Sequence, residues 1–323
     1  MRAVVIDRFG GPDELHLAEV SAPVVGPTDV MIAVRSAGLG SWDKDERAGG
    51  FAEEYAAPPS FPYVLGWDGA GDVVEVGSEV ERFSPGDVVY AASTAAPRGG
   101  FYAELAVVDQ EHVALVPDGI PVEQAGAMAW DSLTAMSGLE TLALHPDETL
   151  LVFGASGGIG HFAVQLARRW GVRVIAVASG GDGVALCRRL GATLTIDGRR
   201  ENITDAVTEF APEGVDAVLL TAGGPAGDEV LSLLTPDGRA ASPHGVDPVP
   251  GGGATVPVRF YSGDRSRAGF DRLAKLIANG DYETALADRF PFSEAVNAHH
   301  ALAGHYAGKM ALIPGIPGAD APS

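Results

Sequence analysis

The chain has 323 residues, 46% of them hydrophobic, which is enough for two globular domains. Its formal net charge of −21 argues against a nucleic-acid-binding protein, because phosphate contacts require clustered lysine and arginine. One cysteine, Cys187, excludes an intramolecular disulfide framework and any metal site built from several cysteines. No apolar run is long enough to span a bilayer and the N-terminus lacks a signal-peptide pattern, so we expect a cytoplasmic protein.

Short alternating segments separated by glycine and proline turns fill residues 1 to about 118. This pattern predicts an all-β unit, either a barrel or a sandwich. The predicted strands are Met1–Asp7, Leu15–Val20, Asp29–Ala37, Gly71–Val76, Asp87–Ala91, Phe101–Val108 and His112–Val116. Between Gly40 and Tyr63 the alternation stops, and we expect a polar, aromatic loop of a length that is usually functional or mobile.

From Pro121 onwards the pattern changes to helices alternating with strands. Val122–Leu144 is predicted to be helical with a break near Asp131 and Ser132. Predicted strands follow at 150–153, 172–178, 193–197, 215–221, 238–242 and 255–260. The helical segments between the first five indicate a doubly wound parallel sheet, which binds ligands at the carboxyl ends of its strands.

The C-terminal part is predicted to contain one more helix and a return to strand. Residues 263–280 have an apolar helical face, and the tail from Arg289 returns to a strand and a helix before ending in Lys309–Ile313. We therefore expect the doubly wound unit to be inserted in the chain and the tail to rejoin the first domain.

A glycine-rich turn, Gly154-Ala155-Ser156-Gly157-Gly158-Ile159-Gly160, joins the predicted strand 150–153 to a helical segment. Such a turn aims backbone N–H groups and the positive end of a helix at one point, which suits a pyrophosphate. Gly157 would let a phosphate approach closely, and Gly160 would let the helix pack on the strand. Ala155 replaces the first glycine of the G-x-G-x-x-G pattern, so a glycine-rich turn of another α/β protein is the alternative. The next strand follows at βαβ spacing and favours dinucleotide binding.

Six short motifs together resemble one superfamily over nearly the whole chain. They are Gly66–Gly71, Gly86–Val89, Leu133–Ala135, Gly154–Gly160, Leu190–Ala192 and Gly308–Met310. The chain resembles the medium-chain dehydrogenase/reductase superfamily and, within it, the zinc-independent quinone oxidoreductase (zeta-crystallin-like) branch. The resemblance implies an α/β fold in which a Rossmann doubly wound parallel sheet (122–262) is inserted into a GroES-like β-barrel catalytic domain (1–121 and 263–323).

The same resemblance implies an NADP-dependent enzyme that transfers hydride to a quinone or an α,β-unsaturated carbonyl compound. Two alternatives stay open: a zinc-free ketone reductase, and a Rossmann-derived binding or non-redox protein. Zinc-dependent members carry a cysteine near Gly40 and a Gly-His-Glu sequence where this chain has Gly66-Trp67-Asp68. Catalytic zinc needs about three protein ligands. Trp67 cannot ligate and no cysteine precedes it, so we expect no metal.

The expected cofactor residues lie mainly in the Rossmann segment. Proteins that prefer NAD usually place an acid at the end of the second strand, where this chain has Ser179, so we expect NADP(H). The resemblance implies that Ser179 donates to the 2′-phosphate. NADH stays the alternative, because the family's lysine and tyrosine fall at Gly183 and Gly198. The expected cofactor set is Thr134, Ser156, Gly157, Gly158, Ile159, Ser179, Arg199, Ala222, Ser242, His244 and Lys309.

The segment Gly40-Ser41-Trp42-Asp43 matches an Asn-x-x-Asp element of the family. Asp43 would orient the cofactor or relay a proton, or it would only cap a turn, and Tyr55 is the expected general acid. The expected walls of the substrate pocket are Trp42, Tyr63, Trp67, Trp130 and Tyr261. The predicted strand 255–260 is expected at a sheet edge, and the resemblance suggests that it pairs with a second copy in a homodimer.

Overall fold

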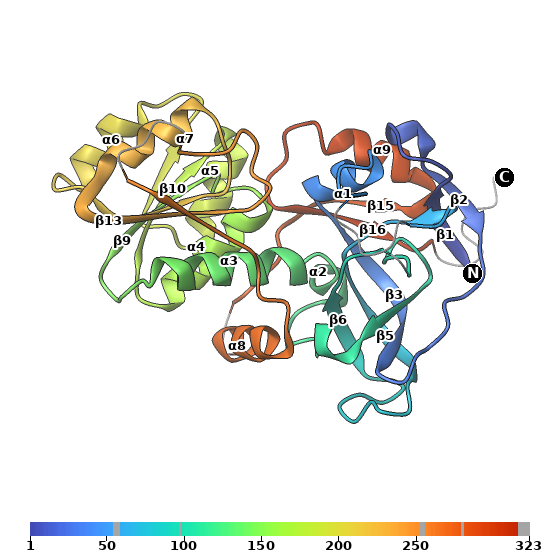
Figure 1. Cartoon of the computed structure of the whole chain (residues 1–323). Helices are drawn as coiled ribbons and strands as arrows, with labels where there is room; N and C mark the ends of the chain where they lie inside the picture. The colour runs from blue at the N-terminus through green and yellow to red at the C-terminus, as the bar shows by residue number, and fades with distance from the viewer. Residues whose placement is uncertain (54–58, 97, 252–255, 279–280, 316–323) are drawn as a thin grey trace. The chain divides into compact units, whose positions relative to one another are not determined.

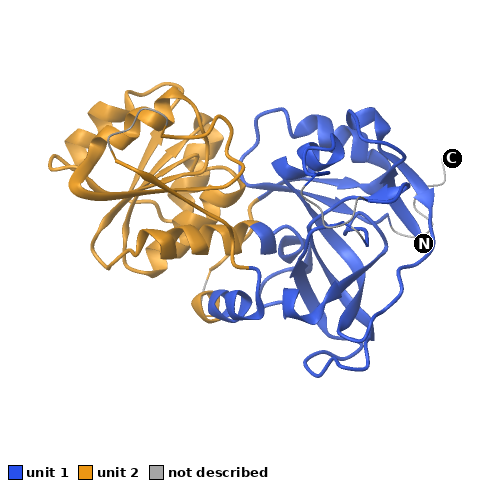
Figure 2. Cartoon of the chain, in the orientation of Figure 1, with its two compact units in different colours: residues 1–130, 265–274, 286–323 blue, residues 131–264, 275–285 orange. Residues whose placement is uncertain are grey.

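The computed structural model describes residues 1–53, 59–96, 98–251, 256–278 and 281–315. The chain forms two compact units, coloured separately in Figure 2. Unit 1 consists of Met1–Trp130, Arg265–Ala274 and Leu286–Ser323, and unit 2 of Asp131–Asp264 and Lys275–Ala285. The expected domain ranges differ from these units at residues 122–130, 263–264 and 275–285.

Unit 2 contains a six-stranded sheet in which every pair of neighbouring strands is parallel (Figure 1). The strand order is β11-β10-β9-β12-β13-β14. The strands are β9 (Thr149–Phe153), β10 (Arg173–Ala178), β11 (Leu194–Asp197), β12 (Val215–Leu220), β13 (Leu234–Pro243) and β14 (Val258–Tyr261). The predicted doubly wound parallel sheet is confirmed, with β14 at an edge; residue 255 of that predicted strand lies outside the described residues.

The helices of unit 2 connect its strands. They are α4 (Gly158–Arg169), α5 (Gly180–Arg189), α6 (Ile203–Phe210), α7 (Pro225–Glu229) and the 3₁₀ turn η3 (Val230–Leu233), preceded by α3 (Ala129–Leu142), whose first two residues belong to unit 1. The buried core includes Leu151, Ile175, Val177, Val218 and Leu220 from the three adjacent strands β10, β9 and β12. The strands read as apolar runs because both faces of a parallel sheet are covered.

The predicted break in the segment 122–144 is in the wrong place. Helix α2 (Val122–Ala125) ends before Gly126, and α3 begins at Ala129, so Asp131 and Ser132 lie within a helix. The backbone N–H groups of Ala127 and Met128 donate to carbonyls three residues back, at 3.2 Å each. A tight turn therefore interrupts the helix where side-chain periodicity gives no signal.

Residues 275–285 belong to unit 2 because polar groups fix them to its helices. The Tyr282 hydroxyl lies 2.6 Å from Ser132 Oγ, and its ring stacks on Phe162 with centroids 5.5 Å apart. The Gln165 side-chain amide donates to the carbonyl of Glu283 at 3.0 Å and accepts from its N–H at 3.0 Å. Helix α8 (Arg267–Ile277) leads into this segment; residues 279–280 of the predicted helix lie outside the described part of the chain.

Unit 1 is built from two sheets of mostly antiparallel strands. The larger sheet has the order β15-β16-β3-β5-β6-β8 with β7 also pairing β3, and the smaller has the order β2-β1-β4. The strands are β1 (Arg2–Ile6), β2 (His16–Glu19), β3 (Asp29–Leu39), β4 (Tyr63–Val64), β5 (Asp68–Val76), β6 (Val88–Ala92), β7 (Leu105–Asp109), β8 (Val113–Leu115), β15 (Leu286–Pro291) and β16 (Lys309–Ile313). The remaining elements are η1 (Pro12–Glu14), η2 (Gln110–His112), η4 (Phe292–Glu294) and α9 (Ala295–Ala301). Strand β16 pairs antiparallel with β3, so the tail completes the first sheet as its pattern predicted.

The expected loop between Gly40 and Tyr63 contains a helix, α1 (Ser41–Arg47). The Asp43 carboxylate caps its N-terminus by accepting the Gly40 N–H at 2.7 Å. The helix buries Asp43, Glu46 and Arg47. Because this buried face is charged and not apolar, hydrophobic periodicity could not reveal the helix.

Candidate functional site

The turn between β9 and α4 has the geometry of a phosphate-binding loop. Gly154 has a φ of +82°, which favours glycine, and Gly157 is the N-cap of α4. A Cβ atom at position 160 would lie 2.2 Å from the Gly154 carbonyl oxygen, so only glycine lets α4 begin so close to the strand. The first-turn N–H groups of α4 have no partner within the helix. These donors and the close backbone approach fit the pyrophosphate of a dinucleotide.

The turn after β10 lies beside this loop. Ser156 Oγ accepts the N–H of Ser179 at 3.4 Å. A Cβ atom at position 183 would lie 2.8 Å from Ser156 Oγ, so Gly183 leaves no room for a lysine side chain without a shift of Ser156. A Cβ at Gly181, in contrast, would meet no atom within 4 Å. The structure thus brings Ser156 and Ser179 together, with open space beside the turn.

The other expected cofactor residues in unit 2 differ in burial and in their neighbours. Ala222 lies next to Gly154, and Thr134 is buried in α3 beside Gly263. The Ser242 hydroxyl is buried and donates to the carbonyl of Leu220 at 3.0 Å. His244 is exposed, with Nδ1 3.2 Å from Ser262 Oγ. Sequence reasoning missed Thr221, whose hydroxyl donates to the carbonyls of Phe153 (2.9 Å) and Gly154 (3.1 Å) and so holds the phosphate loop.

Tyr261, expected in a substrate pocket, is packed within unit 2. Its hydroxyl would lie 2.3 Å from a Cβ atom at Gly138, so the ring sits against α3. Burial raises the pKa of the Tyr261 hydroxyl. These contacts lie within unit 2, whereas the other expected pocket residues belong to unit 1.

Three tryptophans and one phenylalanine form an aromatic cluster in unit 1. The ring centroids are 6.2 Å apart for Trp42 and Trp67, 5.7 Å for Trp42 and Trp130, 4.5 Å for Trp67 and Trp130, and 5.2 Å for Phe51 and Trp67. Trp42 is in the first turn of α1 and Trp67 directly precedes β5. The Nε1–H groups of Trp42 and Trp67 are buried and have no acceptor among the described residues. Two donors that lack a partner in one apolar cluster require an explanation.

The aromatic cluster accounts for one departure from the family motif. A Cβ atom at Gly40 would lie 2.4 Å from the six-membered ring of Trp42. The indole therefore fills the space that the family's asparagine side chain would need. Two cations lie against the cluster: the Arg265 guanidinium carbon is 3.4 Å from the Trp130 ring centroid and Lys309 Nζ is 4.6 Å from that of Trp42.

Buried acidic residues lie beside these indoles. Asp43 is fully buried, and burial raises its pKa well above the usual range, helped by Glu46 and Asp68 and opposed by the Gly40 N–H and Lys309. The Tyr63 hydroxyl donates to Glu46 Oε1 at 2.7 Å. Asp68 Oδ2 accepts the backbone N–H of Trp130 at 3.3 Å. The raised pKa favours a protonated Asp43 that can donate a hydrogen bond.

Lys309, expected at the cofactor, lies at the start of β16 and is only 2% exposed. Its Nζ lies over the Trp42 ring and its charge acts on Asp43, so Lys309 belongs with the residues of unit 1 that were expected at the substrate. Asp43, Trp42, Tyr63, Trp67 and Trp130 all belong to this same group. Tyr55, the expected general acid, lies outside the described residues.

A buried cation–histidine pair was not anticipated from the sequence. Arg47 Nη1 donates to His299 Nδ1 at 2.6 Å, and Arg47 Nε donates to the Gly10 carbonyl at 3.1 Å. Burial and the neighbouring guanidinium lower the pKa of His299 to about 3, so its ring is neutral. Asp43 and Arg47 are four residues apart, which would put both side chains on one face of a helix, so this spacing is a signal for Arg47. No sequence pattern indicates that His299 is its partner.

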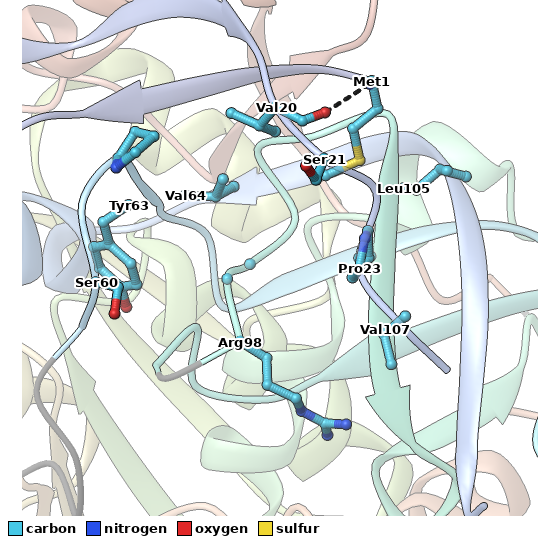
Figure 3. Close-up of a pocket in the computed structure, with 14 residues that line it drawn as sticks. Met1, Val20, Ser21, Pro23, Ser60, Tyr63, Val64, Arg98, Leu105 and Val107 are labelled. Carbon is cyan, nitrogen blue, oxygen red and sulfur yellow. Dashed lines mark hydrogen bonds between the residues drawn. The ribbon is translucent and has the colours of Figure 1, made fainter. Parts of the chain in front are cut away.

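A separate cavity of about 230 Å³ lies near the N-terminus (Figure 3). Its lining includes Met1, Val20, Tyr63, Arg98 and Val107. The only charged side chain in the lining is that of Arg98, which pairs with Asp29 at 2.6 Å. Its walls offer little chemistry, and it is not the candidate active site.

Among the residues that the structure describes, no helix is both long enough and apolar enough for a membrane span. The same residues include no group of three or more histidine, cysteine or acidic residues suited to a metal ion.

Comparison with known proteins identifies the family. Residues 26–118 match the alcohol dehydrogenase GroES-like domain, and residues 158–260 match the zinc-binding dehydrogenase family model. A quinone oxidoreductase of Pseudomonas aeruginosa is 34% identical over 95% of this chain and 97% of that protein. The chain belongs to the quinone oxidoreductase family. The resemblance predicted from its motifs and the GroES-like and Rossmann fold are therefore confirmed.

The names of two further relatives of this quinone oxidoreductase family member state a cofactor or a substrate. An NADPH-dependent alkenal/one oxidoreductase from Arabidopsis thaliana is 31% identical over 97% of this chain and 80% of that protein. The Escherichia coli quinone oxidoreductase, solved in complex with NADPH, has a TM-score of 0.83 at 25% identity, covering 97% of this chain and all of that one.

Proposed function

We propose that this protein is an NADPH-dependent oxidoreductase that transfers hydride to a quinone or an α,β-unsaturated carbonyl compound without zinc. The observation that carries the proposal is the aromatic cluster with its two buried indole N–H donors. One donor belongs to Trp67, which stands where zinc-dependent members have a histidine ligand. Relatives that act on quinones and on alkenals or alkenones support the substrate class.

The groups proposed to hold the cofactor are the phosphate loop of unit 2 and the adjoining turn at Ser179. Ser156, Gly157 and the first turn of α4 would bind the pyrophosphate, and Ser179 the 2′-phosphate. When bound, NADPH supplies the hydride. The solved NADPH complex of the Escherichia coli relative supports this assignment.

Stabilisation of charge on the substrate oxygen is assigned to unit 1. Reduction of an isolated ketone localises negative charge on one oxygen, where a metal is the stronger stabiliser. A quinone or enone spreads that charge into a phenolate or an enolate, for which hydrogen-bond donors suffice. The Nε1–H groups of Trp42 and Trp67 and the ammonium of Lys309 would supply this stabilisation, and the flat indoles would stack on the conjugated substrate.

The proton that completes the reduction needs a donor with a suitable pKa. We assign this role to Asp43, whose pKa is raised by burial, or to Tyr55, which the sequence places in the same segment. Arg47 and His299 are assigned no proton transfer, because His299 is neutral at physiological pH with its Nδ1 accepting from Arg47.

The test is a substrate panel. Purified protein is assayed for NADPH oxidation with 1,4-benzoquinone, a cyclic enone, a saturated ketone and a primary alcohol, before and after dialysis against a strong chelator. We expect turnover of the quinone and the enone at least 100-fold above the ketone, unchanged by chelation, because delocalised charge needs no metal.

Three results would contradict parts of this proposal. Turnover of saturated ketones with none of enones would favour the zinc-free ketone reductase. One zinc ion per chain that tracks activity would contradict zinc independence. A protein that binds neither NADPH nor NADH would favour the non-redox alternative.

We also propose a homodimer formed through β14. This strand lies at one end of the six-stranded sheet, and its Phe260 side chain is 42% exposed. Unpaired strand edges are usually paired or covered. Small-angle scattering at micromolar concentration is expected to give twice the chain mass of 33.2 kDa. A monomeric mass would contradict the proposal.

A further inference from the structure

A buried carboxylate joins two turns at the carboxyl end of the unit 2 sheet. Asp197, the last residue of β11, is 7% exposed. Its Oδ1 accepts the backbone N–H of Gly180 at 3.1 Å and that of Arg199 at 3.1 Å. Its Oδ2 lies 3.8 Å from Nε of Arg200. One carboxylate thus binds both the turn after β10 and the turn after β11.

The position of Asp197 relates it to the ribose 2′-position of a dinucleotide. In parallel register Asp197 is the partner of Ala178, the last residue of β10. Rossmann proteins that prefer NAD usually carry an acid at the end of that second strand, where it reads the 2′-hydroxyl. Here Ser179 follows the second strand, β10. The acid in this protein is Asp197 at the end of the neighbouring strand β11, and it accepts the N–H of Gly180 in the turn after β10.

The cations that would offset this charge are few. Gly183 occupies the family's lysine position, and Ser156 blocks a side chain there. Arg200 Nε lies 3.8 Å from Asp197 Oδ2, so the positive charge of Arg200 is partly neutralised by the carboxylate. Ser179 and the exposed Arg199 are other groups of these turns that carry donors suited to a 2′-phosphate.

We propose that Asp197 is a specificity-determining residue that opposes the 2′-phosphate, so that the protein accepts NADH as well as NADPH. A carboxylate repels a dianionic phosphate but not a neutral hydroxyl. It also withholds Arg200 from the phosphate. The proposal rests on the proposed function insofar as the phosphate loop must bind a nicotinamide dinucleotide.

The test is Asp197→Asn, with dissociation constants for NADPH and NADH measured by isothermal titration calorimetry. The asparagine carbonyl still accepts from Gly180 and Arg199, so the turns keep their hydrogen bonds. We expect the Kd for NADPH to fall about tenfold, or about 1.4 kcal/mol, while the Kd for NADH stays within twofold. NADH binding by the same variant reports that the site is folded.

Two matched variants isolate the position of the charge. Glu201→Gln removes a carboxylate from the same turn, one whose Oε1 accepts the N–H of Asp197 at 2.7 Å; its NADPH-to-NADH ratio is expected to stay within twofold. Ser179→Asp adds a carboxylate to the first turn and is expected to weaken NADPH binding about tenfold.

Two outcomes would overturn the assignment of Asp197. One is an unchanged or lower preference for NADPH in Asp197→Asn while the wild type binds both cofactors. The other is an equal gain in Glu201→Gln, which would assign the effect to overall charge. A wild-type protein that binds neither cofactor would instead overturn the proposed function, and this inference with it.

Discussion

Gly160→Ala is expected to raise the Kd for NADPH at least 100-fold. The added Cβ would lie 2.2 Å from the Gly154 carbonyl oxygen and 2.7 Å from the Ala155 Cα. Both are backbone atoms of the phosphate loop, so the loop itself must move to relieve the overlap. We also expect the free energy of unfolding to fall by about 1–3 kcal/mol, the usual range for an overpacked site. Calorimetric titration with NADPH and urea denaturation measure the two effects.

Gly181→Ala provides the matched control for this substitution. A Cβ at position 181 would meet no atom within 4 Å, and the residue is helical in α5. We expect unchanged NADPH binding and a gain of about 0.4–1 kcal/mol, because alanine restricts the unfolded chain. NADPH binding by Gly160→Ala within fivefold of the wild type would mean that α4 can move away from the loop.

Asp43→Asn is expected to change how the stability of the protein depends on pH. Burial raises the pKa of Asp43 well above 3.8. Between the unfolded and folded pKa values the native protein holds a proton that the unfolded chain has released. The free energy of unfolding of the wild type should therefore fall by up to about 1.4 kcal/mol per pH unit as the pH rises through this window. The asparagine variant cannot ionise and lacks this contribution.

Urea denaturation of both proteins at half-unit steps from pH 4 to pH 9 measures the difference. The stability of Asp43→Asn relative to the wild type should rise with pH and become constant above the folded-state pKa. Asp45→Asn, an exposed position on the same helix, is the control and should show no such trend. A constant difference between Asp43→Asn and the wild type across this range would show that Asp43 is ionised in the folded protein throughout.

The fold was predictable where burial is apolar. The central strands β9, β10 and β12 of unit 2 are mostly apolar, and the glycines from Gly154 to Gly160 mark the turn that follows β9. Helix α1 was missed because it buries Asp43, Glu46 and Arg47. In the sequence, a helix that buries charged residues is as polar as a solvent-exposed loop, so hydrophobicity does not distinguish the two.

The candidate site was predictable where a motif fixes the position of a residue. Trp42, Asp43 and Trp67 lie in or beside family motifs; the two tryptophans belong to the aromatic cluster, and Asp43 follows Trp42 in α1. His299 contacts Arg47 from a position 252 residues further along the chain. Such a contact depends on tertiary packing, so no local pattern can predict it. The same is true of the contact between Asp197 and Gly180, which lies in the turn after the neighbouring strand β10.

The pairing of β16 with β3 has a consequence for synthesis on the ribosome. Strand β3 is among the first segments to emerge, and its partner β16 is among the last. Residues Ala37–Leu39 of β3 have no native partner on that side until β16 has been made, whereas Asp29–Ala33 pair there with β7. The described strands of unit 2 are complete by Tyr261 and its last segment ends at Ala285, so that unit can fold while the first sheet is still open. We therefore expect nascent chains that stall before residue 309 to expose an unsatisfied β-edge, the kind of surface that recruits chaperones or aggregates.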